Sequence, residues 1–180
     1  SDWPDLRAYA ERLGLTPTPV SPSMAWLGES GYARLQSGLM LVLADVAPVG
    51  PDYLPGHAHA DSLSFECSVG TQRLFVNSGT STYEIGELRQ YQRGTAAHNT
   101  LSVDGADSSE VWAGFRVARR ARVHVLEAPQ AGSPSLKASH DGYRRLGGAP
   151  VHTRHWPLQP QRLDIVDELS GRGEHLVKCH

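Results

Sequence analysis

Short apolar or alternating segments, separated by Gly, Pro, Asn and Asp, follow one another along most of the chain. In residues 62–69, Leu63, Phe65, Cys67 and Val69 alternate with polar residues, which is the period-2 pattern of a half-buried strand. A hairpin is predicted around the turn at residues 37–38. The segments that we expect to form strands are 32–35, 39–45, 62–69, 72–77, 100–103, 116–126, 142–146, 151–156, 162–169 and 175–179. Strands at this spacing, with turn residues between them, predict an all-β sandwich or barrel.

The two ends of the chain differ from this pattern. Residues 1–14 predict one short helix, with Ser1 or Asp2 as its cap, Pro4 in its first turn and Gly14 at its end. Its apolar stripe has no evident partner, and the final residues, 174–180, look like an interrupted strand. We therefore expect a segment of a longer protein, with a helix and linker over residues 1–27 and a β-domain over residues 28–180.

Composition narrows the class of protein. Hydrophobic residues make up 39% of the chain and charged residues 20%, as in soluble globular proteins, and the formal net charge of −2 argues against a nucleic-acid partner. No apolar run approaches the roughly 20 residues that span a bilayer, so we expect no membrane partner. Cys67 and Cys179 do not make a disulfide framework and are expected to be free thiols.

The strongest candidate chemistry lies in Gly-His-Ala-His-Ala-Asp at residues 56–61. If this segment is extended, His57, His59 and Asp61 project to one face. His98 precedes another expected strand and is a third candidate imidazole. Neutral imidazoles bind zinc and similar metals, although histidines that only hydrogen-bond the backbone at a loop-to-strand junction explain the spacing equally well.

Two further groups of polar residues are candidates. Asn77 begins an Asn-Ser-Gly-Thr-Ser-Thr-Tyr segment that ends at Tyr83, and its amide could offer an oxygen to a metal, or simply form a turn. A basic group accompanies Trp112 and Phe115, and arginines with aromatic rings suit an acidic polysaccharide, as well as an ordinary solvated sheet face. Its members are Arg89, Arg93, Arg116, Arg119, Arg120 and Arg122.

Three motifs together resemble the C-terminal β-domain of the heparinase II/III-like family. They are His-Ala-His-Ala-Asp at 57–61, Asn-Ser-Gly-Thr-Ser-Thr-Tyr at 77–83, and Ala-His-Asn-Thr at 97–100, with Trp-Ala-Gly-Phe-Arg at 112–116 extending the match. The resemblance implies a layered antiparallel β-sandwich, preceded by an α-helical toroid domain of which the N-terminal helix is a remnant. It also implies a polysaccharide lyase that cleaves uronic-acid-containing polysaccharides by β-elimination, with this chain inactive alone.

The same resemblance implies roles for individual residues. His57 is expected to be catalytic and to face the substrate, a divalent metal such as zinc is expected on His59, Asn77 and His98, and substrate is expected to contact Arg93, Asn99 and Tyr83. The family pattern has Asp where this chain has Asn77, and an amide oxygen binds zinc more weakly than a carboxylate, so Asp61 would compensate only if it reaches the same pocket.

The implied partners are an acidic polysaccharide and the toroid domain of the same protein, and the implied location is periplasmic or secreted. Two other functions stay open at this point. One is a non-catalytic carbohydrate-binding β-sandwich module in which the His motif is structural. The other is a cupin-like metalloenzyme that uses His57, His59 and His98, although Glu66 is poorly spaced for a cupin ligand.

Overall fold

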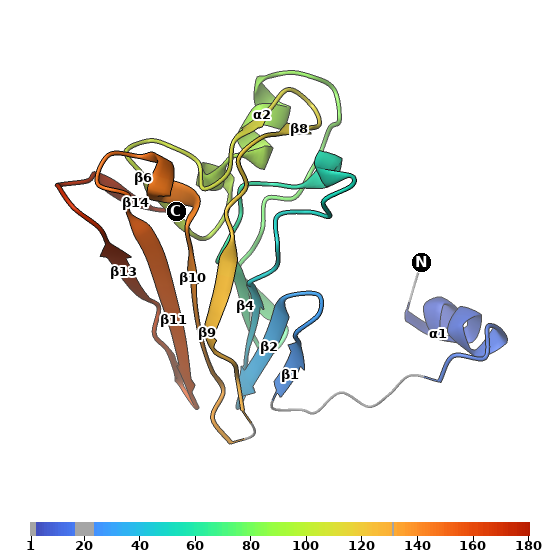
Figure 1. Ribbon diagram of the computed structural model, residues 1–180. Helices are drawn as coiled ribbons and strands as arrows, with labels where there is room; N and C mark the ends of the chain where they lie inside the picture. The colour runs from blue at the N-terminus through green and yellow to red at the C-terminus, as the bar shows by residue number, and fades with distance from the viewer. Residues whose placement is uncertain (1–2, 17–23, 131) are drawn as a thin grey trace.

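The computed structural model describes residues 3–16, 24–130 and 132–180, and most of them belong to antiparallel β-sheets (Figure 1). The first sheet has the strand order β1-β2-β3-β4-β5. Its strands are β1 (Met24–Leu27), β2 (Tyr32–Ser37), β3 (Met40–Asp45), β4 (Phe65–Val69) and β5 (Gln72–Phe75). The predicted hairpin around residues 37–38 is confirmed as β2 and β3, in which Ser37 pairs with Met40.

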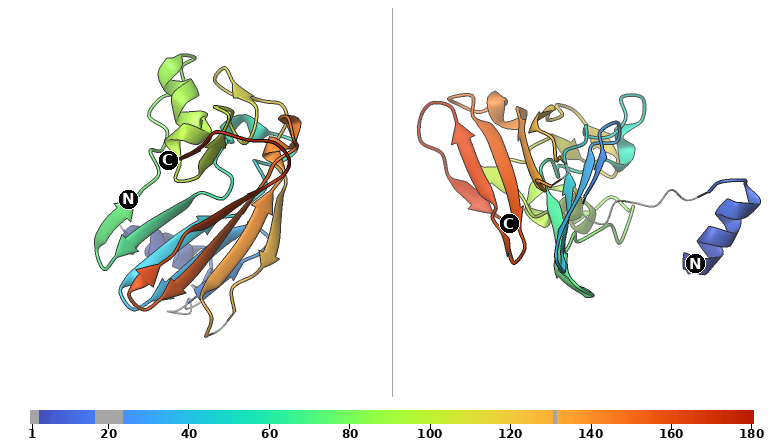
Figure 2. Two further views of the ribbon diagram at one scale, coloured as in Figure 1. Left: turned by 90° about the vertical axis from the view of Figure 1, so that its left-hand side faces the viewer. Right: turned by 90° about the horizontal axis from the view of Figure 1, so that it is seen from below.

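The second sheet has the order β12-β11-β10-β9, and β13 pairs with the other part of β11. Its strands are β9 (Val123–Glu127), β10 (Ser135–His140), β11 (Val151–Gln159), β12 (Arg162–Leu163) and β13 (Val166–Ser170). Figure 2 shows, in the view from below, that the two sheets form two layers.

The hydrophobic core lies between these layers. Alternate residues of β2, β3 and β4 face those of β10 and β11, and Trp156 of β11 is fully buried among them. The other members are Ala33, Leu35, Val42, Ala44, Val46, Leu63, Phe65, Cys67, Leu136, Ala138 and Leu158. Burial of this apolar surface is the main favourable contribution to folding. The expected fold class, an all-β layered sandwich, is therefore confirmed.

Shorter elements gather at one end of the sandwich, above the sheets in Figure 1. They are α2 (Glu87–Arg93), β6 (Leu101–Val103) paired with β14 (Val177–Cys179), and β7 (Val111–Trp112) paired with β8 (Arg116–Val117). Three 3-10 helices, Pro55–His57, Thr95–Ala97 and Gly142–Arg145, lie in the loops between the described strands. This end carries the candidate site.

Several expected strands were wrong in detail. A 3-10 helix, Gly142–Arg145, takes the place of the strand expected at residues 142–146. The single strand expected at residues 116–126 is two strands, β8 and β9. The strand expected at residues 62–69 begins only at Phe65, because Leu63 has a φ of 60°, outside the extended region. Helix α2 and strand β10 were not expected at all.

Helix α1 (Trp3–Arg12) confirms the expected N-terminal helix, while its proposed caps, Ser1 and Asp2, lie outside the described residues. It stands beside the sandwich and not against it (Figures 1 and 2), and Leu6, Tyr9 and Leu13 stay exposed. No helix in the described part of the chain has the length and apolar character to cross a bilayer. Cys67 is a buried free thiol and Cys179 an exposed one.

Candidate metal and substrate site

The His-Ala-His-Ala-Asp segment is an irregular loop, so the extended conformation that would place His57, His59 and Asp61 on one face is not adopted. His57 ends a 3-10 helix, and residues 58–64 are tied to neighbouring segments by backbone and hydroxyl groups. The Ala60 amide donates to the Arg93 carbonyl at 2.8 Å, and the Thr95 hydroxyl donates to the Ala60 carbonyl at 2.7 Å. These bonds satisfy backbone groups that a sheet would otherwise pair. Consequently His57 and His59 meet different neighbours.

His59, Asp61 and His98 form one cluster. One ligand atom from each of the three side chains can be chosen so that all lie within 4.8 Å of one another, and the His59 and His98 ring centroids are 5.3 Å apart. Two imidazoles and a carboxylate are donors that suit zinc and related divalent ions. Sequence reasoning named both histidines as ligands and left open whether Asp61 reaches them, and the cluster shows that it does.

The electrostatics of the cluster favour uncharged imidazoles. Burial, followed by the neighbouring His98 and Arg89, lowers the pKa of His59 to about 4. Burial also lowers the pKa of His98, and it raises the pKa of Asp61. Burial and the charge of Asp61 raise the pKa of Asp45 to about 7. Asp45 and Asp61 are both partly buried, so a cation beside them would relieve the unfavourable burial of negative charge.

Arg89 is the member of this cluster that sequence reasoning did not place there, since it was assigned only to the general basic group. It is 1% exposed, its Nε donates to the Gly114 carbonyl at 3.1 Å, and its Nη1 lies 3.3 Å from both His59 Nε2 and Thr80 Oγ1. Because a guanidinium can only donate, His59 Nε2 accepts this bond as a neutral imidazole. No short-range sequence signal marks this contact, which spans thirty residues along the chain.

The buried Nε2 of His98 has no hydrogen-bond partner among the described residues. Its Nδ1 lies 3.2 Å from Asn77 Nδ2, and Asn77 Oδ1 accepts from the Gly79 amide at 2.8 Å. Buried polar atoms in folded proteins are normally paired, so this nitrogen is an open position for a water or an ion. The donor set and the unpartnered nitrogen therefore fit a divalent metal. Asn77 contacts the cluster, and its role as a direct ligand stays a prediction.

His57 lies exposed beside an aromatic pair. The rings of Tyr83 and Phe115 are stacked at 5.9 Å and 15°, and the His57 ring meets both edge-on, at 5.5 Å and 6.0 Å. The Arg89 guanidinium carbon is 5.3 Å from the Tyr83 ring centroid on the inner side of this pair. Exposed aromatic faces of this kind can pack on the apolar faces of sugars. Tyr83 therefore lies beside His57, which is the arrangement expected if both residues contact the substrate.

Arg93 and Asn99 are occupied by the protein itself. Arg93 is fully buried and donates to the carbonyls of Ala58, Trp112, Ala113 and Arg116 at 3.1–3.2 Å. Asn99 Nδ2 donates to two backbone carbonyls, those of Phe65 at 2.9 Å and Val76 at 3.2 Å. Both side chains hold together the loops that carry the cluster, and direct substrate contact by either residue stays a prediction.

A hollow of about 460 Å³ opens beside these groups, and His57, His59 and Asp61 line one wall of it. Tyr32 and Asp45 line another part, and the loop of residues 46–54, here called the partition loop, supplies most of the rest. The site therefore combines an exposed imidazole, a candidate metal cluster and an open space large enough for a sugar unit.

Residues 19–180 match the heparinase II/III-like C-terminal domain family, which covers most of the chain. The protein therefore belongs to this family, as the three motifs indicated.

One curated relative is the FtsZ-localized protein C of Caulobacter vibrioides, which is 31% identical in an alignment of 152 positions that covers 79% of this chain and 25% of the relative. Among solved structures, the heparinase III that is the BT4657 gene product superposes with a TM-score of 0.71 at 20% identity, over 97% of this chain and 28% of that one. The heparan sulfate lyase HepC from Pedobacter heparinus gives a TM-score of 0.69 at 15% identity, over 94% and 27%. The chain thus spans about a quarter of the length of these relatives.

Proposed function

We propose that this chain is the β-domain of a polysaccharide lyase that cleaves uronic-acid-containing polysaccharides by β-elimination, and that it needs a toroid domain for turnover. The observation that carries the proposal is the position of His57, which lies exposed at a hollow that is also lined by His59 and Asp61 of the His59–Asp61–His98 cluster. The family membership and the fold shared with a heparinase III and a heparan sulfate lyase support it.

β-Elimination removes the C5 proton of a uronate, breaks the bond between C4 and the glycosidic oxygen, and forms the C4–C5 double bond. The leaving oxygen takes up a proton, so an acid and a base are both required. The uronate carboxylate must also be neutralised, because its charge opposes the build-up of negative charge in the transition state.

His57 is the group in this chain that reaches the substrate. As a base it would take the C5 proton, and as a cation it would neutralise the uronate carboxylate. Tyr83 and Phe115 fix its ring edge-on and offer an apolar surface on which a sugar can rest. Arg89 lies behind them and adds fixed positive charge.

We propose that a divalent metal binds His59, Asp61 and His98, with zinc as the first candidate for this donor set. When bound, the metal supplies positive charge to the inner wall of the site and fixes the three side chains. In this proposal Asp61 provides the carboxylate that the family pattern has at position 77.

Metal analysis tests the cluster. Purified wild type should contain or bind one divalent ion per chain, and His98→Ala and Asp61→Asn should each lose it. His124→Ala, which removes an exposed histidine of β9, is the matched control and should keep the metal. A wild type that binds no stoichiometric metal would refute the metal site.

Turnover is measured from the ultraviolet absorbance of the unsaturated uronate product. We expect no product from this chain alone and steady product formation by the longer protein, which His57→Ala should abolish. Turnover by this chain alone would contradict the need for a toroid domain. We also expect the protein in the periplasmic or secreted fraction of its cells.

A second candidate is a non-catalytic carbohydrate-binding module, the alternative raised by the sequence. The exposed aromatic pair of Tyr83 and Phe115 favours it, because aromatic faces can pack on sugars without any chemical step. Binding of acidic glycans by the longer protein, without any unsaturated product, would favour this function.

A further inference from the structure

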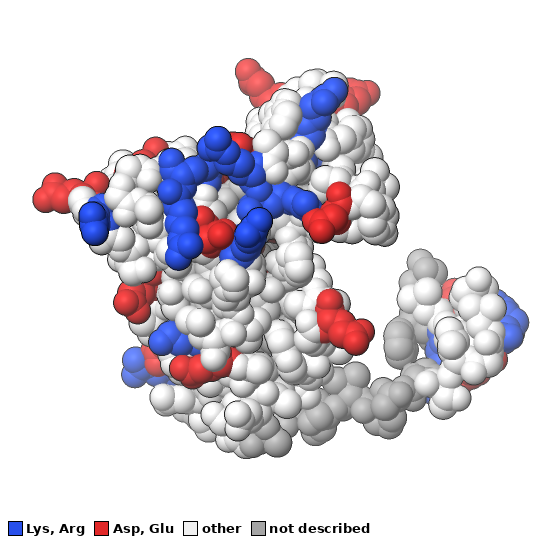
Figure 3. All heavy atoms as spheres, viewed as in Figure 1, with Lys and Arg blue, Asp and Glu red and all other residues white. Residues whose placement is uncertain are grey.

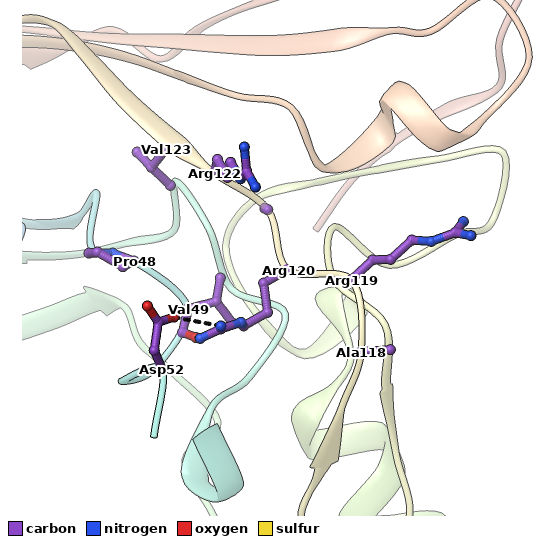
Figure 4. Close-up of a pocket in the computed structure, with 9 residues that line it drawn as sticks. Pro48, Val49, Asp52, Ala118, Arg119, Arg120, Arg122 and Val123 are labelled. Carbon is purple, nitrogen blue, oxygen red and sulfur yellow. Dashed lines mark hydrogen bonds and ion pairs between the residues drawn. The ribbon is translucent and has the colours of Figure 1, made fainter. Parts of the chain in front are cut away.

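A second hollow, of about 730 Å³, lies on the other side of the partition loop (Figure 4). It is lined by Pro48, Val49, Asp52 and the six consecutive residues from Ala118 to Val123. These consecutive residues connect β8 to β9, so the hollow lies where the end of the sandwich meets the second sheet. It contains no residue of the His59–Asp61–His98 cluster.

This second hollow, here called the arginine groove, is strongly basic. Arg119, Arg120 and Arg122 line it, and Asp52 is its one acidic lining residue among those described. Figure 3 shows Lys and Arg side chains gathered in a band across the upper half of this face. Glu110 lies near one edge, 3.9 Å from Arg119. Among the residues that line the groove, three positive charges therefore accompany one negative charge.

Arg120 is held in place at the partition loop. Its Nη1 donates to the Val49 carbonyl at 3.3 Å and its Nη2 to Asp52 Oδ1 at 2.6 Å, and it points toward these residues in Figure 4. These two bonds leave other donors of the guanidinium free for a ligand, since the group has five. The Asp52 side chain is 96% exposed. An ion pair with so exposed a carboxylate is weak enough for another anion to compete with Asp52.

Arg119 and Arg122 are exposed and point away from Asp52 (Figure 4). Arg122 is placed by its own backbone, whose amide donates to Asp141 Oδ1 at 2.8 Å. Among the described residues, no ion pair engages the Arg122 side chain. Guanidinium groups bind carboxylates and sulfates through paired, charge-assisted hydrogen bonds, so the groove has the chemistry to bind such groups.

The arginine groove adjoins the His57 hollow. Pro48 and Val49 line both spaces, so the partition loop is the wall that they share. A polymer that places one sugar beside His57 can therefore continue over this wall. In a polysaccharide with an acidic group on each repeating unit, the carboxylate or sulfate of a unit further along would then lie beside the arginines.

We propose that the arginine groove is a remote binding subsite for the acidic groups of a uronate polyanion whose reactive unit lies beside His57, an inference that rests on the proposed function. Arg120 and Arg122 supply its charge, and Asp52 competes with the ligand. The subsite engages only chains long enough to extend across the partition loop.

The test measures binding of size-defined uronate oligosaccharides, from disaccharide upward, to the 180-residue chain. One series is sulfated and the other carries carboxylates alone, to distinguish the two acidic groups. Arg120→Gln and Arg122→Gln should each weaken binding of the longer members about tenfold, which corresponds to about 1.4 kcal/mol. Both variants should bind the disaccharide as wild type does. Asp52→Asn should strengthen binding of the longer members.

Arg162→Gln is the matched control, because it removes an exposed arginine that pairs with Asp164 at 2.7 Å on β12. It should leave all affinities unchanged, and a thermal melt of each variant checks folding. Equal losses for short and long members, no loss in either arginine variant, or no binding of any member by wild type would overturn the subsite. Length-dependent binding without turnover in the longer protein would support the subsite and refute the lyase function.

Discussion

Arg154 of β11 joins the two segments that carry the candidate metal ligands. Its Nη1 donates to the carbonyls of Leu63 at 2.9 Å and Asn99 at 2.6 Å. Leu63 lies two residues after Asp61, and Asn99 directly follows His98. Asp167 of β13 fixes the guanidinium through bonds of 2.7 and 2.9 Å. Arg154 should therefore stabilise the fold and set the spacing of the cluster.

The substitution Arg154→Met removes all of these bonds from a side chain that is 1% exposed, and it leaves Asp167, at 19%, with His152 as its remaining partner at 2.7 Å. Breaking one side of a buried ion pair costs about 3–5 kcal/mol. The matched control is Arg162→Met, whose pair with Asp164 has the same 2.7 Å distance but an arginine that is 70% exposed. That loss should be about 1 kcal/mol or less.

Urea unfolding of the two variants gives both free energies of unfolding. Metal titration of Arg154→Met, under conditions in which it is folded, should also show weaker affinity than wild type. Equal stability losses in the two variants would refute the energetic reasoning. Wild-type metal affinity in a folded Arg154→Met protein would refute the role of Arg154 in spacing the ligands.

Three further outcomes follow from individual contacts. Asn77→Asp should raise divalent-metal affinity about 10–100-fold in a metal titration, because a carboxylate accepts a hydrogen bond from the Nδ1–H of His98 and so leaves the lone pair of Nε2 free to bind a metal; unchanged or weaker affinity would contradict this. Burial, followed by charged neighbours, lowers the pKa of His140 well below its ordinary value, so protonation of the unfolded chain opposes folding as the pH falls through about 6.5. The stability advantage of wild type over His140→Gln should therefore shrink between about pH 7 and pH 5, and a constant difference would disprove it. Gly31→Ala places a Cβ 2.3 Å from a backbone carbon of the partition loop, at a φ of +75°. It should lower the free energy of unfolding by about 1–3 kcal/mol more than Gly70→Ala, since Gly70 has a similar φ of +58° but open space around it. Equal melting temperatures of the two variants would argue against the overlap.

The sandwich could be predicted because most of its strands carry a local signal. Alternation of Phe65, Cys67 and Val69 with polar residues places β4 without reference to the rest of the chain. Helix α2 had no such signal, since its seven residues are mostly polar and its place depends on buried contacts of Arg89 and Arg93. The strand expected at residues 142–146 fails for a similar reason, because Tyr143 is buried through contacts made far along the chain.

The candidate site was predictable in its residue types and not in its geometry. The spacing of His57 and His59 suggested a common face, whereas the loop turns one toward the aromatic pair and the other toward His98. Arginine side chains usually lie on protein surfaces, so the burial of Arg89 beside His59 could not be inferred from the sequence. Such long-range contacts are fixed only by the tertiary fold.

The four carbonyls gathered by Arg93 have a consequence for how this end of the molecule moves. They belong to the loop that carries the two histidines and to the β7–β8 hairpin. Among the described residues, the fully buried Arg93 guanidinium is the one donor that they share. If either segment opened alone, the buried guanidinium would lose some of its hydrogen-bond acceptors, which is energetically unfavourable. The two should therefore exchange their amide hydrogens as one cooperative unit, and any ligand too large for the hollows as they stand could enter only if this unit were displaced as a whole.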